Sequence, residues 1–382
     1  MAKWFEKRLD EIAEFNPRES LKKGSIAKKI SMDKLQPFCR DVPGFELEPY
    51  SGGTKFRNGD TIMARITPCL ENGKTAKVSV LENGEVGFGS TEYIVFRAKD
   101  GCDSDFLYYL VTSSIVRGPA IKSMVGSSGR QRVQTDVLQT LMVKVPDLET
   151  QQSISGILKS LDDKIAANRK INDNLEQQAR ALYQRMFIDN PVSGGYMGTL
   201  SDIADITMGQ SPNGSSYNED GNGAVFFQGR AEFGFRFPSV RLYTTEPKRM
   251  ACANDTLMSV RAPVGDLNVA YTDCCIGRGL AAIHSKSNQQ SFVLYTMFSL
   301  HKQLDVFNGE GTVFGSINRT SLTELPIFIP SDREIVKFEA IVAPIDAAIR
   351  NNYEEICRLE KIRDALLPKL ISGELDVSAV EL

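Results

Sequence analysis

The chain has 382 residues, with 45 Lys and Arg against 48 Asp and Glu, so its net charge is −3. This length predicts two or three domains, and a content of 42% hydrophobic and 24% charged residues excludes a disordered or fibrous chain. No apolar stretch approaches the roughly 18 residues of a membrane span, and a nearly neutral chain is not a non-specific coat for nucleic acid. The seven Cys residues are scattered without a C-x-x-C motif, which predicts reduced thiols and a cytoplasmic protein.

Short apolar or alternating runs bounded by turn residues predict strands in both halves of the chain. The expected strands span residues 61–66, 93–96, 141–145, 256–260 and 326–329. The expected short helices span residues 106–113 and 291–304. Because strands and helices do not alternate regularly, this pattern favours mixed α+β domains over a doubly wound sheet.

Two long segments carry apolar residues at steps of three and four, the spacing of a coiled-coil seam. The first runs from about Thr150 to Phe187, and the second has the same pattern near the end of the chain. A single helix with one apolar stripe is unstable in water, so each helix is expected to pack on its own domain or to pair with the other. The predicted seam residues are Ile154, Leu158, Leu161, Ile165, Asn168, Leu175, Leu182, Ile345, Ile349, Asn352, Ile356, Leu359 and Leu366.

Two polar features of the seam carry specific expectations. Asn168 and Asn352 occupy equivalent positions in the two helices, and a polar seam residue can fix the register of a helix pair. Pro344 lies near the start of the second helix, where it is expected to cause a kink or a break. The second rod is therefore expected to begin after Pro344.

The two helices belong to an internal duplication. The offset that relates Asn168 to Asn352 also relates Asp162 to Asp346, and farther upstream Gly59–Met63 resembles Asn254–Met258. The predicted fold class is α+β, with two mixed α/β domains in tandem and two long helices that pair as an antiparallel coiled coil. The expected boundaries are 1–146 and 191–330 for the domains, and 147–190 and 331–382 for the helices.

Catalytic motifs are missing from the sequence at their required spacing. Gly73-Lys74-Thr75 lacks the Gly that a phosphate-binding loop needs five residues earlier, where Pro68 stands. Neither of the two His residues stands at metal-ligand spacing to another His or to a pair of Cys residues. We therefore expect a protein that binds without performing chemistry, with no metal and no cofactor of its own.

Basic, amide and hydroxyl side chains recur in Gly- and Pro-rich loops, where they are typical of DNA contacts. Arg and Gln can read guanine and adenine edges, hydroxyls suit phosphate oxygens, and Gly allows close approach of the backbone. For each loop taken alone, a solvated turn stays the alternative interpretation. The candidate DNA-binding residues are Lys55, Arg57, Arg65, Thr67, Ser127, Ser128, Arg130, Gln131, Gln228, Arg230, Arg261, Arg278, Thr312 and Ser316.

Taken together, these features resemble the specificity (S) subunit of type I restriction–modification systems. The most specific match lies in the second half, at Gly209–Pro212, Phe226–Gly229, Asp255–Asp266 and Gly277–Leu280. The end of the second helix is also similar to the family, at Ala365–Leu370. The first domain matches less well, as is expected of a domain that varies with the DNA sequence it recognises.

The resemblance implies a non-catalytic subunit that recognises double-stranded DNA. Each domain would read one half of a split asymmetric site, and the paired helices would set the distance between the halves. The helices would also dock methyltransferase (M) subunits, of which two are expected, and restriction (R) subunits would join for cleavage. S-adenosylmethionine, Mg²⁺ and ATP are expected on those partners. Two alternatives stay open: a DNA methyltransferase with degenerate motifs, and a coiled-coil adaptor that binds no DNA.

Overall fold

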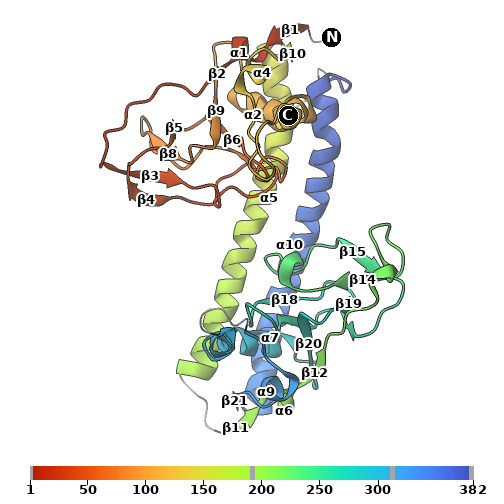
Figure 1. Cartoon of the computed structure of the whole chain (residues 1–382). Coiled ribbons are helices and arrows are strands. Elements are labelled where there is room, and N and C mark those ends of the chain that lie inside the picture. Colours follow the sequence, from red (N-terminus) through yellow and green to blue (C-terminus); the bar gives the residue numbers. More distant parts are fainter. Residues whose placement is uncertain (1–2, 190–193, 310–314, 378–382) are drawn as a thin grey trace. The chain divides into compact units, whose positions relative to one another are not determined.

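The computed structural model describes residues 3–189, 194–309 and 315–377. The chain divides into two units, of which the first contains Met1–Arg169 and Tyr353–Leu382 and the second contains Lys170–Asn352. The boundary falls inside both long helices, α5 (Leu148–Tyr183) and α10 (Asp332–Ser372), so each unit has one domain and a part of each helix (Figure 1). Among the described residues, no helix is long and apolar enough to cross a membrane.

The domain of the first unit contains two four-stranded sheets. The antiparallel sheet has the order β2 (Ala13–Phe15), β9 (Tyr93–Ala98), β6 (Thr61–Ala64) and β7 (Thr75–Lys77). The second sheet has the order β4 (Glu46–Pro49), β3 (Ile26–Ile30), β8 (Gly87–Gly89) and β5 (Thr54–Phe56), with β3 parallel to β8. Every residue of β6 is buried, which explains why this strand lacks a polar face.

Helices and a short ribbon complete this domain. The helices are α1 (Leu9–Ile12), α2 (Ser104–Thr112), α3 (Ser114–Lys122) and α4 (Thr135–Gln139). Asp103 is the N-cap of α2, and its side chain accepts a 2.7 Å hydrogen bond from the amide of Phe106, as N-cap residues typically do. The ribbon pairs β1 (Trp4–Arg8) with β10 (Met142–Pro146) directly before α5.

The domain of the second unit repeats this arrangement. Its antiparallel sheet has the order β12 (Ala204–Met208), β20 (Leu280–Ser285), β17 (Thr256–Ser259) and β18 (Leu267–Val269). Its other sheet has the order β13 (Tyr217–Asn218), β15 (Leu242–Thr244), β14 (Ala224–Phe227), β19 (Cys274–Ile276) and β16 (Met250–Ala251). The strands β14 and β19 are parallel, as are β3 and β8 in the first unit.

The remaining elements of the second domain are equivalent to those of the first. The helices are α6 (Leu200–Ile203), α7 (Gln290–Ser299), α8 (His301–Asp305) and α9 (Arg319–Thr323). The ribbon pairs β11 (Tyr196–Thr199) with β21 (Pro326–Ile329) directly before α10. The predicted strands and short helices are all present, although the helix expected at 291–304 is divided into α7 and α8.

Small details confirm the internal duplication. Asp60 accepts a 2.8 Å hydrogen bond from the amide of Arg57, and Asp255 accepts one of the same length from the amide of Cys252. An isolated bridge joins Ile66 to Arg132 in one unit, and another joins Arg261 to Ser316 in the other. The two domains share the order of the antiparallel sheet and these loop contacts, and the mixed sheet of the second domain has one additional strand, β13.

The two long helices contact each other within each unit. In the first unit, Asn168 Nδ2 donates to Glu355 at 2.8 Å and Arg363 Nη1 donates to Asp162 at 2.9 Å. In the second unit, Asn352 Nδ2 donates to Asn172 Oδ1 at 2.8 Å. Residue numbers rise along α5 as they fall along α10, so the helices run antiparallel in both units.

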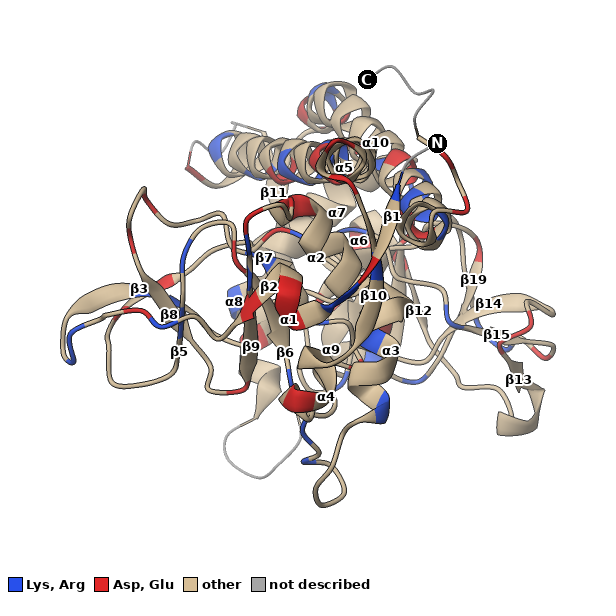
Figure 2. Cartoon of the chain, turned by 90° about the horizontal axis from the view of Figure 1, so that it is seen from above, with Lys and Arg blue, Asp and Glu red and all other residues tan. Residues whose placement is uncertain are grey.

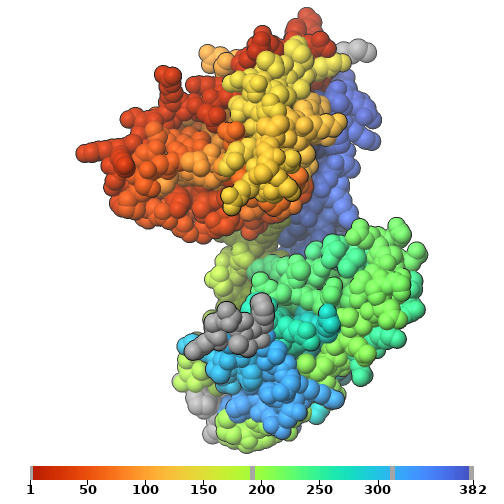
Figure 3. Space-filling view, in the orientation of Figure 1, coloured from red at the N-terminus to blue at the C-terminus, as the bar shows by residue number. Residues whose placement is uncertain are grey.

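The seam also packs on the domains, so the two arrangements expected from the sequence coexist. Ile154 and Leu158 of α5 join Leu370 of α10 in the core of the first domain, and Figure 3 shows its red and orange residues against the yellow ones that include the start of α5. Six predicted seam residues are buried and the other seven are half-buried. The buried residues are Ile154, Leu158, Ile165, Asn168, Ile349 and Ile356, and the half-buried ones are Leu161, Leu175, Leu182, Ile345, Asn352, Leu359 and Leu366.

The expected break at Pro344 is wrong. The helix α10 begins at Asp332 and continues through Pro344 to Ser372. Proline removes one backbone hydrogen bond, at a cost of roughly 3 kcal/mol or more. Phe338 and Val342 before the proline and Ile349 after it are fully buried, and this packing holds both sides of the helix in place.

Candidate nucleic-acid interface

Each domain is attached to a long helix by the same pair of side chains. Tyr109 of α2 donates a 2.8 Å hydrogen bond to Asp162 of α5, and Tyr295 of α7 donates one of 2.9 Å to Asp346 of α10. Burial raises the pKa of both tyrosines, so each hydroxyl keeps its proton and remains a donor. These two contacts define equivalent attachment points in the two units.

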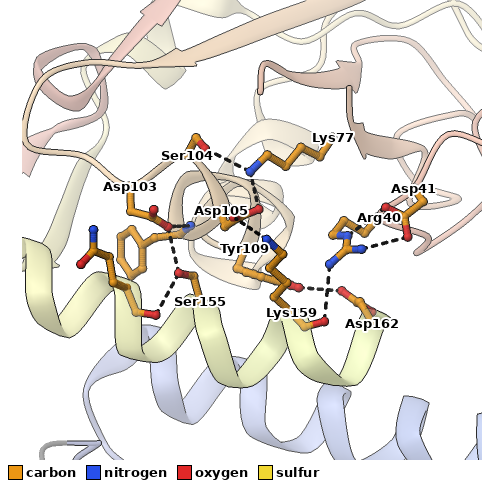
Figure 4. Close-up of polar contacts among 12 residues, drawn as sticks. Arg40, Asp41, Lys77, Asp103, Ser104, Asp105, Tyr109, Ser155, Lys159 and Asp162 are labelled. Carbon is orange, nitrogen blue, oxygen red and sulfur yellow. Dashed lines mark hydrogen bonds and ion pairs between the residues drawn. The ribbon is translucent and has the colours of Figure 1, made fainter. Parts of the chain in front are cut away.

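A buried arginine reinforces each attachment point. In the first unit, Arg40 donates to Asp163 of α5 at 2.6 Å and contacts Asp41 in a bidentate manner at 3.0 and 3.1 Å. Its carbonyl accepts a 2.9 Å hydrogen bond from the amide of Lys77 at the end of β7. Figure 4 shows the contact of Arg40 with Asp41, and beside it the contacts of α2 and its N-cap with Ser155, Lys159 and Asp162 of α5.

The equivalent residue in the second unit is Arg236, which contacts both long helices. Its carbonyl accepts a 2.8 Å hydrogen bond from the amide of Val269 at the end of β18, as that of Arg40 does from Lys77. Its guanidinium donates to Asp346 of α10 at 3.2 Å and to Glu176 of α5 at 3.0 Å. Arg236 exposes 4% of its surface, so the loop that follows β14 is firmly fixed to the helices.

The candidate residues Gln228 and Arg230 lie on that same loop. Both are exposed, and Arg230 forms an ion pair with Asp266, which follows β17. Deeper in the loop, Glu232 accepts a 3.0 Å hydrogen bond from Arg241 and is itself buried. The loop is therefore ordered at both ends while its tip presents an amide and a guanidinium to solvent.

One other candidate of the second domain lies beside this loop, and two more are paired elsewhere. The amide of Gly277 donates to the carbonyl of Phe227 at 2.8 Å, which brings Arg278 next to Gln228. A Cβ atom at Gly277 would lie 2.8 Å from the carbonyl oxygen of Gln228, so only glycine permits this approach. Arg261 and Ser316 are joined by the bridge described above and are exposed, whereas Thr312 lies outside the described residues.

The candidates of the first domain divide into two groups. Lys55 and Arg57 are committed to Glu19: Lys55 Nζ donates to its carbonyl at 2.7 Å, and Arg57 donates twice to its carboxylate at 2.7 Å. The hydrogen bond from Arg57 lowers the pKa of the buried Glu19 carboxyl, and Arg97 adds to the effect. Arg57 therefore already has an anionic partner within the domain, whereas Lys55 is held by a neutral backbone carbonyl.

The second group surrounds the loop that precedes α4. The amide of Thr67 donates to the carbonyl of Gln131 at 3.0 Å, and Arg65 Nη2 donates to the carbonyl of Val133 at 3.3 Å. Ser127, Ser128 and Arg130 occupy the tip of this loop and are exposed. The structure thus brings Arg65, Thr67 and Gln131 together beneath an exposed tip of hydroxyl and guanidinium groups.

The electrostatic setting is mixed rather than strongly positive. In Figure 2, segments with Lys or Arg are interspersed with segments that carry Asp or Glu on the elements of both units. Among the described residues, no group of three or more His, Cys, Asp or Glu is placed to hold a metal ion. What the loops offer is a set of hydrogen-bond donors and acceptors that suit base edges and phosphates.

Sequence reasoning missed the residues that hold these loops in place. Arg40 and Arg236 each stand alone in an irregular loop, where no periodicity or motif marks them. Glu19 was missed for the same reason. The duplication could have identified the two arginines. When the two halves are aligned so that the ends of β7 and β18 coincide, Arg40 lies opposite Arg236.

Comparison with known proteins agrees with this architecture. Residues 1–177 match the family model described as "Type I restriction modification DNA specificity domain". The chain is 32% identical over 257 residues to the MjaX specificity subunit of Methanocaldococcus jannaschii, covering 63% of this chain and 60% of that protein. It is 24% identical to the type I restriction enzyme HindI specificity subunit of Haemophilus influenzae, covering 88% of this chain and 89% of that protein.

A solved structure shares the fold of the whole chain. The type I restriction–modification S subunit from M. genitalium superposes with a TM-score of 0.60 at 16% identity, covering 97% of this chain and 96% of that one. The fold defines a class of proteins with two tandem mixed domains, each followed by a long helix. The chain is similar to type I restriction–modification specificity subunits, and its residues 1–177 match the specificity-domain model of that family.

Proposed function

We propose that this chain recognises double-stranded DNA for a type I restriction–modification complex and is not itself catalytic. The observation that carries the proposal is the duplication: two equivalent domains are each fixed to a long helix through the same Tyr–Asp contact. Two equivalent domains in one chain suit a site with two separate halves. The similarity to type I specificity subunits and the presence of exposed donor and acceptor groups on ordered loops support this function.

In the second domain, the loop tip with Gln228 and Arg230 reads one half of the site. Asp266 holds one edge of the Arg230 guanidinium, which orders the side chain before DNA arrives, and the remaining donors are available for a guanine edge. Gln228 supplies the amide that suits adenine. Arg261, Arg278 and Ser316 lie on neighbouring exposed loops and are assigned to phosphates.

In the first domain, the exposed tip with Ser127, Ser128 and Arg130 reads the other half of the site. Gln131, Thr67 and Arg65 support this tip from below through the contacts described above. Lys55 and Arg57 are engaged by Glu19, so they order the edge strand β5 and contribute to DNA binding mainly through their positive charge.

The paired helices separate the two reading domains and dock two M subunits, with R subunits joining for cleavage. S-adenosylmethionine, Mg²⁺ and ATP reside on those partners. The net charge of −3 supports this division of labour, because a nearly neutral chain gains little from phosphate contacts and needs partners that add positive charge.

Co-expression with the M subunit of the same system tests the proposal. Mapping N6-methyladenine across the host genome should give one asymmetric motif with two specific halves and an unspecific spacer. The chain expressed without M should transfer no methyl group from labelled S-adenosylmethionine to DNA. Methyl transfer by the isolated chain would favour the degenerate methyltransferase, and a co-expressed complex that neither binds nor methylates DNA would favour the adaptor.

A further inference from the structure

A pocket of about 380 Å³ lies in the second unit, where the loop that follows β14 meets α5, α7 and α8. Its lining combines aromatic rings with cationic side chains, namely Phe233, Phe235, Phe298, Arg180, Arg230 and His301. Phe235 is exposed and Phe298 is half-buried, so both rings are accessible to a group that enters from solvent. Aromatic and arginine side chains are enriched at the centres of protein–protein interfaces.

The first unit has a pocket at the equivalent place, but its volume is only about 50 Å³. Thr75 and Leu267 are equivalent because they pair with Met63 and Met258 of the matching strands. Arg180 and Asp364 are related by the same offset as the two seam asparagines, with α5 and α10 exchanged. The lining positions that the two pockets share are Gly73 and Gly265, Thr75 and Leu267, Thr112 and Phe298, and Asp364 and Arg180.

Phe38 accounts for the difference in volume. Its ring packs so closely on Gly73 that a Cβ atom at that glycine would lie 2.6 Å from the ring, and the guanidinium of Arg117 lies 5.1 Å from the ring centroid. All three residues line the pocket of the first unit. Counted from the buried arginine of each unit, the residue equivalent to Phe38 is Gly234. The second unit has no side chain at this position, so its pocket is open.

The cationic side chains of the open pocket already have carboxylate partners, so they do not select an anion. The ion pairs are Arg180–Glu176, Arg230–Asp266 and His301–Asp305. A guanidinium that is paired along its edge can still lie over an aromatic face, as that of Arg180 does at 3.5 Å from the centroid of the Phe298 ring. The pocket therefore suits an uncharged aromatic ring, which is also what the first unit places there.

We propose that this pocket receives a Phe, Tyr or Trp side chain of the M subunit, in the way that the pocket of the first unit receives Phe38. Arg180 belongs to α5, so the pocket is continuous with the helix surface to which the proposed function assigns M. The inference deepens that function and rests on it. Because Phe38 occupies the equivalent pocket, this contact is made with the second unit alone.

Photocrosslinking in the complex of the full chain with the M subunit of the same system tests the contact. The photoreactive residue p-benzoylphenylalanine replaces either Phe235, which lines the pocket, or Val240, which is exposed on the same loop outside the lining. Light should attach position 235, and not position 240, to one segment of M that contains an aromatic residue. If position 235 of an assembled complex reacts only with DNA, only with this chain or with nothing, the proposal is overturned. If no complex with M forms, the proposed function fails and this inference fails with it.

Variants of the pocket measure what the contact contributes. Phe298→Thr introduces the residue that the first unit has at position 112, and Leu267→Trp fills the pocket. Loss of a central aromatic anchor typically weakens an interface by about tenfold or more, and both variants should weaken the binding of M to that extent. Phe38→Ala removes an exposed phenylalanine from the first unit and should leave the affinity for M unchanged.

Urea unfolding identifies the variants that are folded. Wild-type affinity for M in folded Phe298→Thr and Leu267→Trp would contradict the assignment. If methylation mapping with these variants still gives a motif with two halves, the proposed function stands and only the pocket contact is refuted.

Discussion

Both units attach their domain to a long helix through a Tyr–Asp hydrogen bond, but the ion pairs beside that bond differ in their exposure to solvent. In the first unit, Arg40 pairs with Asp41 and Asp163, whose side chains are 37% and 53% exposed. In the second unit, Arg236 pairs with Glu176 and Asp346, which are 12% and 21% exposed. The Tyr–Asp contact is the same in both units. The carboxylates that pair with the neighbouring arginine are exposed in the first unit and largely buried in the second.

The largest expected effect comes from removing the buried arginine. Arg236→Ala would leave the largely buried Asp346 without its cation, while Glu176 would keep Arg180 as a partner, and breaking a buried pair of this kind typically costs about 3–5 kcal/mol. Arg40→Ala removes a cation from carboxylates that water can reach, so we expect about 1 kcal/mol or less in the first unit. Hydrogen exchange by mass spectrometry measures each unit separately. Equal losses in the two units would show that the difference in burial has no energetic meaning.

The next effect concerns the polar pair in the seam of the second unit. Asn172→Leu leaves the amide of Asn352 without its acceptor, which should destabilise the unit by about 1–3 kcal/mol.

The double variant Asn172→Leu/Asn352→Leu replaces both partners by apolar groups and should recover most of that loss. Urea unfolding of the single and double variants gives the coupling energy. A double variant as unstable as the sum of the single variants would exclude the pairing of these two residues.

The long helices and the contacts between them were predictable to different degrees. The long helices were predictable because Ile, Leu and Asn residues recur every three or four positions over many turns. A pattern of this length can be read from the sequence without knowledge of the tertiary structure. The pairing partners were less predictable. Asn168 and Asn352 occupy equivalent positions, yet in an antiparallel arrangement Asn168 bonds to Glu355 and Asn352 to Asn172.

Local sequence is a poor guide where distant elements decide the outcome. Pro344 has a strong local preference against a helix interior, but the buried residues on both sides of it outweigh that preference. Arg230 could be recognised as an exposed loop residue, whereas its contact with Asp266 depends on how two separate loops meet. The anchoring role of Arg236 depends on its contacts with α5, α10 and β18. These elements are far apart in the sequence, so no local segment predicts this role.

A smaller effect is expected on DNA recognition. Arg230→Ala should cost about 1–3 kcal/mol and relax one position of the half-site read by the second domain. Arg130→Ala is the matched variant in the first domain and should relax the other half-site only. Methylation mapping with the co-expressed M subunit reports both halves in the same molecule. Relaxation of both halves by either variant would indicate a general loss of binding instead of base reading.

The smallest effect is a difference in pH dependence. Hydrogen bonds from Arg57 and Arg132 lower the pKa of Glu19 and Glu92 in the first unit. Their stabilisation is present above the ordinary carboxyl pKa of about 4.3 and is lost as pH falls through the lowered folded-state values. Burial raises the pKa of Glu339 and Asp346 in the second unit. The stabilisation from these two groups is present below the ordinary carboxyl pKa and is lost as pH rises through their raised folded-state pKa values.

Acidification from pH 7 should therefore weaken the first unit relative to the second. The fluorescence of Trp4, the one Trp of the chain, reports the first unit, because this residue packs against the core of that domain. Hydrogen exchange, corrected for its intrinsic pH dependence, reports the second unit. A second unit that loses stability first on acidification would contradict the assigned pKa directions.

If the paired helices set the separation of the two proposed DNA-reading domains, the length of the spacer in the target site depends on the length of the helices. Four residues inserted into α5 between Leu175 and Leu182, with four inserted at the facing position of α10 near Ile349, lengthen the pair by about 6 Å at 1.5 Å per residue. Methylation mapping should then show two unchanged half-sites with a longer spacer. Unchanged half-sites with the original spacer would contradict the account, because the helices would then not determine the distance.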